Sequence, residues 1–226
     1  MGERGTVVFD LDGTLADTAA DLIAAANACF AARGLGSLLD PVADALIAFH
    51  GGRAMLRAGY GRIPSDVLLP PGAEDEDFPR LLDYYDQGIA VSTRLYDGVE
   101  SALEALATEG FVLAVCTNKP EALAEKLLSA LGIRDSFAAM VGADTLPVRK
   151  PDPRPYAAAV DRAGGAVARS FLVGDTETDV KTARACGVPV ALVGFGPEGA
   201  DIARLSPDGI LAQYTDLPQL ARDWLG

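Results

Sequence analysis

The chain has 226 residues, of which 50% are hydrophobic, and a formal net charge of −13. This length suffices for one large domain, or for a domain with a smaller partner, with a buried core. The negative charge argues against a nucleic-acid or anionic-membrane surface, because such a surface needs a basic patch. It does not exclude an anionic small substrate, since a metal ion and a few cations reverse the sign locally.

Cysteine usage indicates a reducing compartment. Cys29, Cys116 and Cys186 are widely spaced and form no CxxC pair, which argues against a disulfide framework or a zinc site. We expect all three to be small buried apolar residues. No apolar run approaches about 18 residues, so we expect no membrane span. Two acids interrupt the first apolar run, so we expect no signal peptide and a cytoplasmic location.

The chain opens with one predicted strand and continues with a helical segment. Residues 6–9 (TVVF) are β-branched or aromatic, as in a buried strand. Residues 17–90 show no clear strand. Their helical patterns, which Pro and Gly separate, lie at residues 18–33, 41–49, 53–58 and 74–87. Asp21 stands three residues after Thr18, which predicts a capping box. We expect the acids at residues 74–77 to form a solvated helix N-terminus.

The second half of the chain alternates short apolar runs with helical patterns. The predicted strands lie at residues 111–116, 137–141, 170–173 and 190–193. The predicted helices lie at residues 120–131, 153–163 and 176–186. This alternation predicts an α/β fold with a Rossmann-like parallel sheet that helices cover on both faces. We expect residues 1–16 and 91–226 to form this core, and residues 17–90 to be an inserted all-helical domain.

Polar residues directly follow the carboxyl ends of the predicted strands or stand in the loops after them. They are Asp10 and Asp12, Thr117 and Asn118, Lys150, and Asp175 and Asp179. In a sheet of this class, ligands bind beyond the carboxyl ends of the strands. For Lys119, the sequence leaves two interpretations open: a residue of the site, or a solvated loop lysine. The combination, rather than any single residue, predicts a functional site at this edge.

These side chains suit phosphoryl transfer with a divalent metal. Several carboxylates in one crevice repel each other unless a hard cation such as Mg²⁺ lies among them. Asp10 and Asp12 point to the same side of an extended segment, so one can attack phosphorus while the other handles the leaving-group proton. Thr117 and Asn118 can hydrogen-bond phosphoryl oxygens, and Lys150 supplies a fixed positive charge.

The sequence resembles the haloacid-dehalogenase-like hydrolase superfamily. The phrases that carry the resemblance are, in order, DLDGTLADT, VCTNKP, the lysine of RKP, and GDTETD. The resemblance implies a phosphatase in which Asp10 is the nucleophile and forms an aspartyl-phosphate. It implies that Asp12 is the general acid and base, and that the backbone carbonyl of Asp12 binds Mg²⁺.

The same resemblance assigns the other candidates. Thr117 and Lys150 would bind phosphate, and Lys150 would also steady the nucleophile. Asp175 would be a metal ligand, and Asp179 would be a metal ligand or a partner of one. The inserted helical domain would be the mobile cap that such enzymes place after the first of these phrases.

Longer phrases resemble the phosphoglycolate phosphatases, LAVCTNKP and GADTLPVRKPDPRP among them. This resemblance implies 2-phosphoglycolate as the substrate, whose carboxylate needs a cation or backbone amides from the cap. Gly52 and Arg53 are the candidates, because the glycine pair Gly51-Gly52 permits close backbone approach and Arg53 opens a predicted helix.

Alternatives remain open at this point. A related phosphatase could act on a nucleotide, a sugar phosphate or pyrophosphate, and a non-catalytic binding or regulatory domain could share the fold. The last is disfavoured, because Asp10, Asp12 and Asp175 are all present. The expected partner is a small phosphate ester, with neither nucleic acid nor membrane, and the chain is expected to be a monomer or homodimer.

Overall fold

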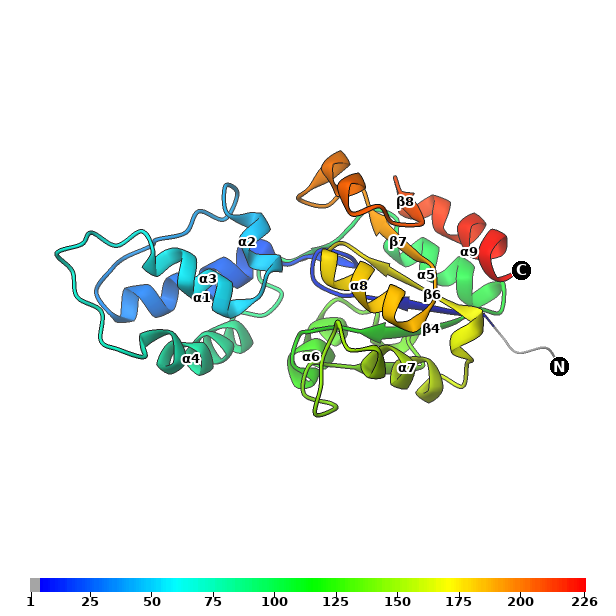
Figure 1. Cartoon of the computed structure of the whole chain (residues 1–226), viewed down its shortest axis with the longest axis horizontal. Coiled ribbons are helices and arrows are strands. Elements are labelled where there is room, and N and C mark those ends of the chain that lie inside the picture. The colour runs from blue at the N-terminus through cyan, green and yellow to red at the C-terminus, as the bar shows by residue number, and fades with distance from the viewer. Residues whose placement is uncertain (1–4) are drawn as a thin grey trace. The chain divides into compact units, whose positions relative to one another are not determined.

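A computed structural model describes residues 5–226, which divide into two compact units. One unit contains the residues up to Asp17 together with Leu95–Gly226, and the other contains Thr18–Arg94. Figure 1 shows the first unit as a sheet between helices and the second as a group of helices. Within the described residues, no helix combines the length and the apolar character that crossing a membrane requires.

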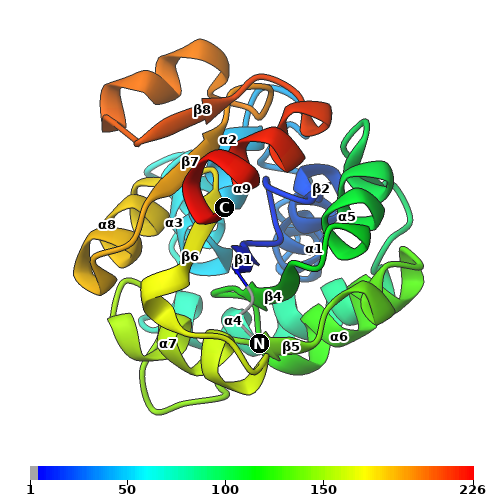
Figure 2. The ribbon, with the colours of Figure 1, turned by 90° about the vertical axis from the view of Figure 1, so that its right-hand side faces the viewer.

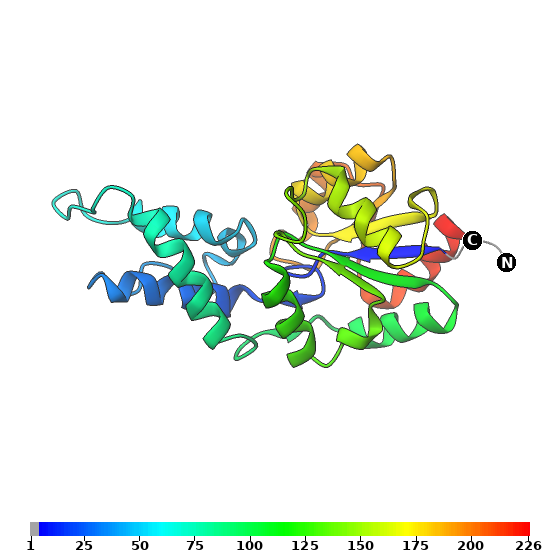
Figure 3. The same cartoon turned by 90° about the horizontal axis from the view of Figure 1, so that it is seen from below.

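The first unit is built on a six-stranded parallel sheet in the order β5-β4-β1-β6-β7-β8. The strands are β1 (Thr6–Phe9), β4 (Val112–Cys116), β5 (Ala139–Val141), β6 (Ser170–Gly174), β7 (Val190–Val193) and β8 (Gly209–Leu211). In Figure 3 the blue β1 lies between the green β4 and the yellow β6. The carboxyl ends of these three neighbouring strands therefore meet at one edge. The predicted parallel α/β fold is confirmed.

Helices cover both faces of this sheet. They are α5 (Val99–Thr108), α6 (Glu121–Ala130), α7 (Pro153–Arg162), α8 (Glu177–Cys186) and α9 (Leu217–Leu225). Figure 2 shows α7 and α8 on one side of the sheet and α5 and α6 on the other. Strand residues alternate between the faces: Leu172 of β6 belongs to the core beneath α7 and α8, whereas Phe171 packs edge-on against Trp224 of α9. Short 3₁₀ turns occupy Arg134–Ser136, Val167–Arg169, Gly199–Leu205 and Tyr214–Asp216.

The second unit consists of helices that pack around α1. These are α1 (Ala19–Ala32), α2 (Ala45–Phe49), α3 (Gly52–Tyr60) and α4 (Ala73–Gln87), and α1 packs against each of the other three. Gly59 of α3 lies so close to Phe30 of α1 that a Cβ would come within 2.2 Å of the ring. Two short strands, β2 (Ala16–Asp17) and β3 (Arg94–Leu95), pair in a separate sheet where the chain leaves and re-enters the first unit.

The predicted capping box at Thr18 is wrong. The Thr18 side chain makes no capping hydrogen bond. The Asp21 carboxylate instead accepts hydrogen bonds from the backbone amides of Ser92 and Thr93 and from the Thr93 hydroxyl, at 2.8–3.0 Å. Asp21 thus ties the end of the helical segment to its first helix. The helical unit consequently runs to Arg94, beyond the boundary expected from the sequence.

The prediction that the acids at residues 74–77 are solvated is wrong for Asp77 of α4. The Asp77 side chain is fully buried, and it pairs with Arg33 at 2.5 Å and with Arg80 at 3.1 Å. The Tyr60 hydroxyl also donates to Asp77. Because α4 packs on α1 and α3, its inward face carries Asp77 into the unit, where two guanidinium groups compensate its charge. A run of four acids therefore contains one internal ion-pair centre.

The remaining differences concern the ends and the number of elements. The helix expected at residues 41–49 begins only at Ala45, because residues 41–44 form a turn around Asp40 and Asp44. The helix expected at residues 53–58 extends over Gly52–Tyr60. The elements α5, α9 and β8 were not among the predicted ones. The strand at residues 190–193 has the predicted bounds.

Candidate functional site

The site forms where β4, β1 and β6 end side by side. Asp10 follows β1 directly, and its backbone amide still donates to the Val173 carbonyl of β6 at 2.9 Å. Thr117 follows β4, and Asp175 follows β6. The strand order therefore brings together residues from three distant parts of the sequence, as the sequence pattern predicts.

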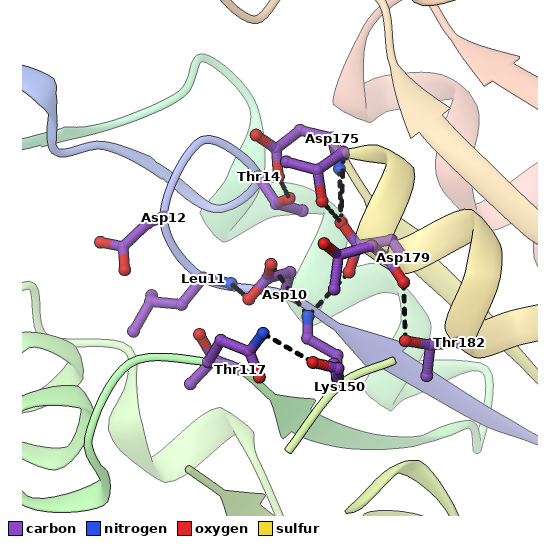
Figure 4. Close-up of polar contacts among 12 residues, drawn as sticks. Asp10, Leu11, Asp12, Thr14, Thr117, Lys150, Asp175, Asp179 and Thr182 are labelled. Carbon is purple, nitrogen blue, oxygen red and sulfur yellow. Dashed lines mark hydrogen bonds and ion pairs between the residues drawn. The ribbon is translucent and has the colours of Figure 1, made fainter. Parts of the chain in front are cut away.

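Lys150 lies between two aspartates and is itself buried. Its ammonium is 2.9 Å from an oxygen of Asp10 and 2.7 Å from an oxygen of Asp179 (Figure 4). Burial lowers the pKa of Lys150, but the two carboxylates outweigh this effect and raise the pKa above its ordinary value. Lys150 therefore stays charged and holds the two carboxylates in place.

Burial and the neighbouring Lys150 have opposite effects on the pKa of the Asp10 carboxyl. Burial raises the pKa of Asp10 to about 6, although Lys150 and a hydrogen bond from Thr117 lower it in part. One oxygen accepts a hydrogen bond from the Leu11 amide at 2.7 Å, and the other faces the Lys150 ammonium. The side chain is thus fixed in orientation by contacts at both of its oxygens.

Asp175 completes a cluster of three aspartates. Asp10, Asp175 and Asp179 each offer one carboxylate oxygen, and these oxygens lie within 4.8 Å of one another. Burial and the neighbouring carboxylates raise the pKa of Asp175 well above its ordinary value. The Thr14 hydroxyl donates to Asp175 at 2.8 Å. Three carboxylates face one ammonium here, so the charges favour a further cation at this point.

Asp179 lies in the first turn of α8 and accepts hydrogen bonds at both of its carboxylate oxygens. One oxygen accepts from Lys150, and the other accepts from the hydroxyl and backbone amide of Thr176, at 2.7 and 3.1 Å. Thr176 and Asp179 together form a capping box at the start of the helix. A Cβ at Gly174 would stand 2.4 Å from Asp179 Cγ, so the strand end accommodates Asp179 only because residue 174 is glycine.

Asp12 is held apart from this cluster. Figure 4 shows its carboxylate directed away from Asp10, Asp175 and Asp179. Both of its oxygens accept from the Lys119 ammonium, at 2.8 and 3.0 Å. The Lys119 side chain is buried, so it is not a solvated loop lysine.

Thr117 and Asn118 occupy different positions, although they are adjacent in the sequence. Thr117 is buried at the end of β4, and its hydroxyl oxygen accepts from the Lys119 amide at 3.2 Å. Asn118 is exposed, and its side-chain amide donates to the Lys150 carbonyl at 3.0 Å. Asn118 thus fixes the loop that carries Lys150. Its predicted contact with phosphate stays a prediction.

The candidate substrate-reading residues of the helical unit lie at the start of α3. Gly51 precedes α3 with φ +90°, a conformation that favours glycine, and Gly52 begins the helix. The Arg53 guanidinium pairs with Asp75 at 2.7 Å and lies over the Phe78 ring at 4.5 Å. Arg53 is therefore an accessible cation with exchangeable surface partners, and its predicted role stays a prediction.

Sequence reasoning missed two contacts of the site. It did not identify Thr14 as a partner of Asp175, although a hydroxyl directly after Asp12-Gly13 was a visible signal. It also left Lys119 open. Gly13 has φ +77°, which allows the tight turn that returns Thr14 toward β6. The pairing of Lys119 with Asp12 depends on side-chain directions that sequence spacing does not give.

Comparisons with known proteins identify similar chains. The model of a family described as haloacid dehalogenase-like hydrolase matches residues 7–193. A phosphoglycolate phosphatase of Mesorhizobium japonicum is 37% identical over 95% of this chain and 93% of its own length. One of Caulobacter vibrioides is 39% identical over 95% of this chain and 89% of its own.

A solved structure is similar over nearly the whole chain. A protein of Haemophilus somnus, described as a predicted phosphoglycolate phosphatase, superposes with a TM-score of 0.85 at 27% identity. The match covers 97% of this chain and 99% of that one. Both units are therefore present in a protein of the same overall length.

Proposed function

Because the chain belongs to the haloacid dehalogenase-like hydrolase family, we propose that it is a phosphatase that hydrolyses 2-phosphoglycolate through an aspartyl-phosphate at Asp10. The observation that carries the proposal is the buried cluster of Asp10, Asp175 and Asp179 around Lys150. The names of relatives at 37–39% identity support the choice of substrate.

Asp10 is the proposed nucleophile. In the first transfer, one Asp10 oxygen forms a bond to phosphorus while the bond from phosphorus to the ester oxygen breaks. In the second, water attacks the same phosphorus, and the Asp10 carboxylate is released together with inorganic phosphate. The contacts from Leu11 and Lys150 support this role, because they fix the carboxylate before the substrate arrives.

Asp12 is the proposed general acid and base. It gives a proton to the ester oxygen as that oxygen leaves, and it takes a proton from the attacking water. In-line transfer places the leaving oxygen on the far side of phosphorus from Asp10. The direction of Asp12, away from the aspartate cluster, supports this division of labour.

The donor set fits a hard divalent cation such as Mg²⁺. The proposed ligands are a carboxylate oxygen of Asp10, one of Asp175, and the backbone carbonyl of Asp12. We propose Asp179 as a further ligand or as a partner of one, because it belongs to the same cluster and also pairs with Lys150. A bound Mg²⁺ supplies positive charge for the phosphoryl oxygens. Lys150 and Thr117 complete the proposed binding of the phosphoryl group.

We propose that the helical unit, Thr18–Arg94, selects the ester as a cap. The Arg53 guanidinium can receive the substrate carboxylate, since its ion pairs with Asp75 and Glu74 are exposed and therefore weak. Arg53→Ala should raise the KM for 2-phosphoglycolate and leave the KM for a neutral aryl phosphate unchanged. Arg57→Ala is the matched control, because Arg57 also pairs with Glu74. An unchanged KM for 2-phosphoglycolate contradicts the role of the Arg53 side chain.

A substrate screen tests the proposed function. Purified protein with Mg²⁺ is offered 2-phosphoglycolate, nucleotides, sugar phosphates and pyrophosphate, and inorganic phosphate release is measured. We expect the highest kcat/KM for 2-phosphoglycolate. A higher value for another ester contradicts the substrate, and no turnover by folded, metal-loaded protein contradicts the activity itself.

A further inference from the structure

We infer that Lys119 is a positioning residue for Asp12, and that it fixes the carboxylate on the leaving-group side of the site. This inference rests on the proposed function of Asp12. The observation behind it is a two-point contact: the Lys119 ammonium lies 2.8 and 3.0 Å from the two oxygens of Asp12.

The backbone of Lys119 is itself held in place. Its amide donates to the Thr117 hydroxyl oxygen at 3.2 Å, and its carbonyl accepts from the Ala143 amide at 2.9 Å. Thr117 follows β4 directly, and Ala143 lies just beyond β5, so both partners belong to the rigid edge of the sheet. The backbone of Lys119 is therefore fixed relative to the ends of β4 and β5.

The burial of the Lys119 side chain strengthens its pairing with Asp12. It is only 3% exposed, whereas that of Asp12 is 19% exposed. A buried ammonium needs a compensating charge, and the Asp12 carboxylate supplies one through both of its oxygens. An exposed lysine pair is weak and mobile by comparison. The burial of Lys119 therefore makes this contact an anchor.

Asp12 needs such an anchor because of its surroundings. It lies beyond the end of β1 and directly before the turn at Gly13, where φ is +77°. The Lys150 ammonium is engaged elsewhere, because it pairs with Asp10 and Asp179. The two lysines thus hold different acids: Lys150 pairs with Asp10 and Asp179, and Lys119 pairs with Asp12.

The test is the dependence of kcat/KM on the leaving group. This parameter covers the steps through departure of the alcohol, and a poor leaving group needs a well-placed proton donor whereas 4-nitrophenol does not. Lys119→Met should lower kcat/KM for 2-phosphoglycolate by about tenfold to a hundredfold. It should change kcat/KM for 4-nitrophenyl phosphate by less than about threefold, because that ester leaves without proton transfer.

Three further variants make the test specific. Lys119→Arg retains the cation and should recover part of the loss. Lys181→Met removes an exposed lysine of α8, which pairs with Glu177, and should behave as wild type. In an Asp12→Asn background, Lys119→Met should add no further loss, because the two residues act as one unit. If Lys119→Met does not fold, Lys119→Gln replaces it and keeps a donor for Asp12.

Several results would overturn the inference. They are an equal loss for both esters, a gain of activity, or a full additional loss in the Asp12→Asn background. A wild-type protein that hydrolyses neither ester overturns the proposed function and this inference together. An active wild type with an unaltered leaving-group dependence in Lys119→Met overturns this inference alone.

Discussion

Gly174→Ala is a small substitution that the structure predicts to be severe. Gly174 ends β6, and a Cβ there would stand 2.4 Å from Asp179 Cγ and 2.6 Å from Asp179 Oδ2. Ordinary contacts between carbon atoms are about 3.5 Å or longer, so Asp179 must shift by roughly 1 Å. Asp179 cannot do so freely, because it is bonded to Lys150 and to the Thr176 hydroxyl, each at 2.7 Å.

The expected cost follows from this geometry. Overpacking of this kind destabilises a protein by about 1–3 kcal/mol. In a chain of this size, each kcal/mol lowers the melting temperature by roughly 2–4 °C. A displacement of roughly 1 Å passed through Lys150 to the nucleophile should lower kcat by about a hundredfold. Thermal unfolding and steady-state hydrolysis of 4-nitrophenyl phosphate measure the two effects.

Gly61→Ala is the matched control. Gly61 follows α3 with φ −66°, and a Cβ there would be 3.4 Å from the nearest atom, an ordinary contact. Its free energy of unfolding should change by no more than about 0.5 kcal/mol, and kcat should stay at the wild-type value. Wild-type kcat in Gly174→Ala, with or without a lower melting temperature, would refute the coupling from Asp179 through Lys150 to the nucleophile.

Three further predictions concern charge. Asp77→Asn should lower the free energy of unfolding by about 3 kcal/mol in chemical denaturation, because it leaves two arginines without their buried partner, whereas exposed Glu76→Gln should change it little. The Arg62 guanidinium lowers the pKa of Asp44 below its ordinary value of 3.8. This pair therefore stabilises the fold above pH 3.8 and ceases to do so as pH falls through the folded-state pKa. The difference in unfolding free energy between wild type and Asp44→Asn should shrink in acid denaturation, and a constant difference would contradict the role of the pair. Chelation of divalent metal should abolish turnover until Mg²⁺ is returned, and Mg²⁺ should raise the melting temperature of wild type but not of Asp175→Asn; an equal rise in both would exclude Asp175 as a ligand.

The edge where the site lies was predictable from sequence, because a parallel sheet places the carboxyl ends of its strands together. Asp10 and Asp175 directly follow apolar runs of the expected length, and these runs form the neighbouring strands β1 and β6. Lys150 is different, since it stands on a loop after β5 with no periodic signal of its own. The sequence placed it after a predicted strand and the RKP phrase supported it, but its contacts with Asp10 and Asp179 depend on how the loop folds back.

The side-chain pairings were beyond sequence reasoning, because they depend on which face of an element turns inward. A run of acids at the start of a helix is usually solvated, yet packing of α4 brings Asp77 onto Arg33. Asp21 has the spacing of a capping box, but the returning segment at residues 92–93 competes successfully for its carboxylate. In both cases tertiary contacts outweigh a local pattern.

Some of the missed elements did carry a signal. The buried residues of α5 recur at helical spacing, namely Val99, Ala102, Leu103 and Leu106. The three-residue strand β8 has a weaker one, since a short edge strand contains too few residues to show alternation. Short elements at the edge of a sheet are therefore defined by their neighbours.

The central claim is that Asp10 carries the phosphoryl group during turnover, and acid-quenched protein tests it most directly. Wild-type protein mixed with substrate and Mg²⁺ is quenched during turnover, and its peptides are examined by mass spectrometry. We expect one phosphoryl group on the peptide that contains Asp10, and neither phosphorylation nor turnover in Asp10→Asn. A phosphoryl group on another residue, or turnover by Asp10→Asn, would contradict it.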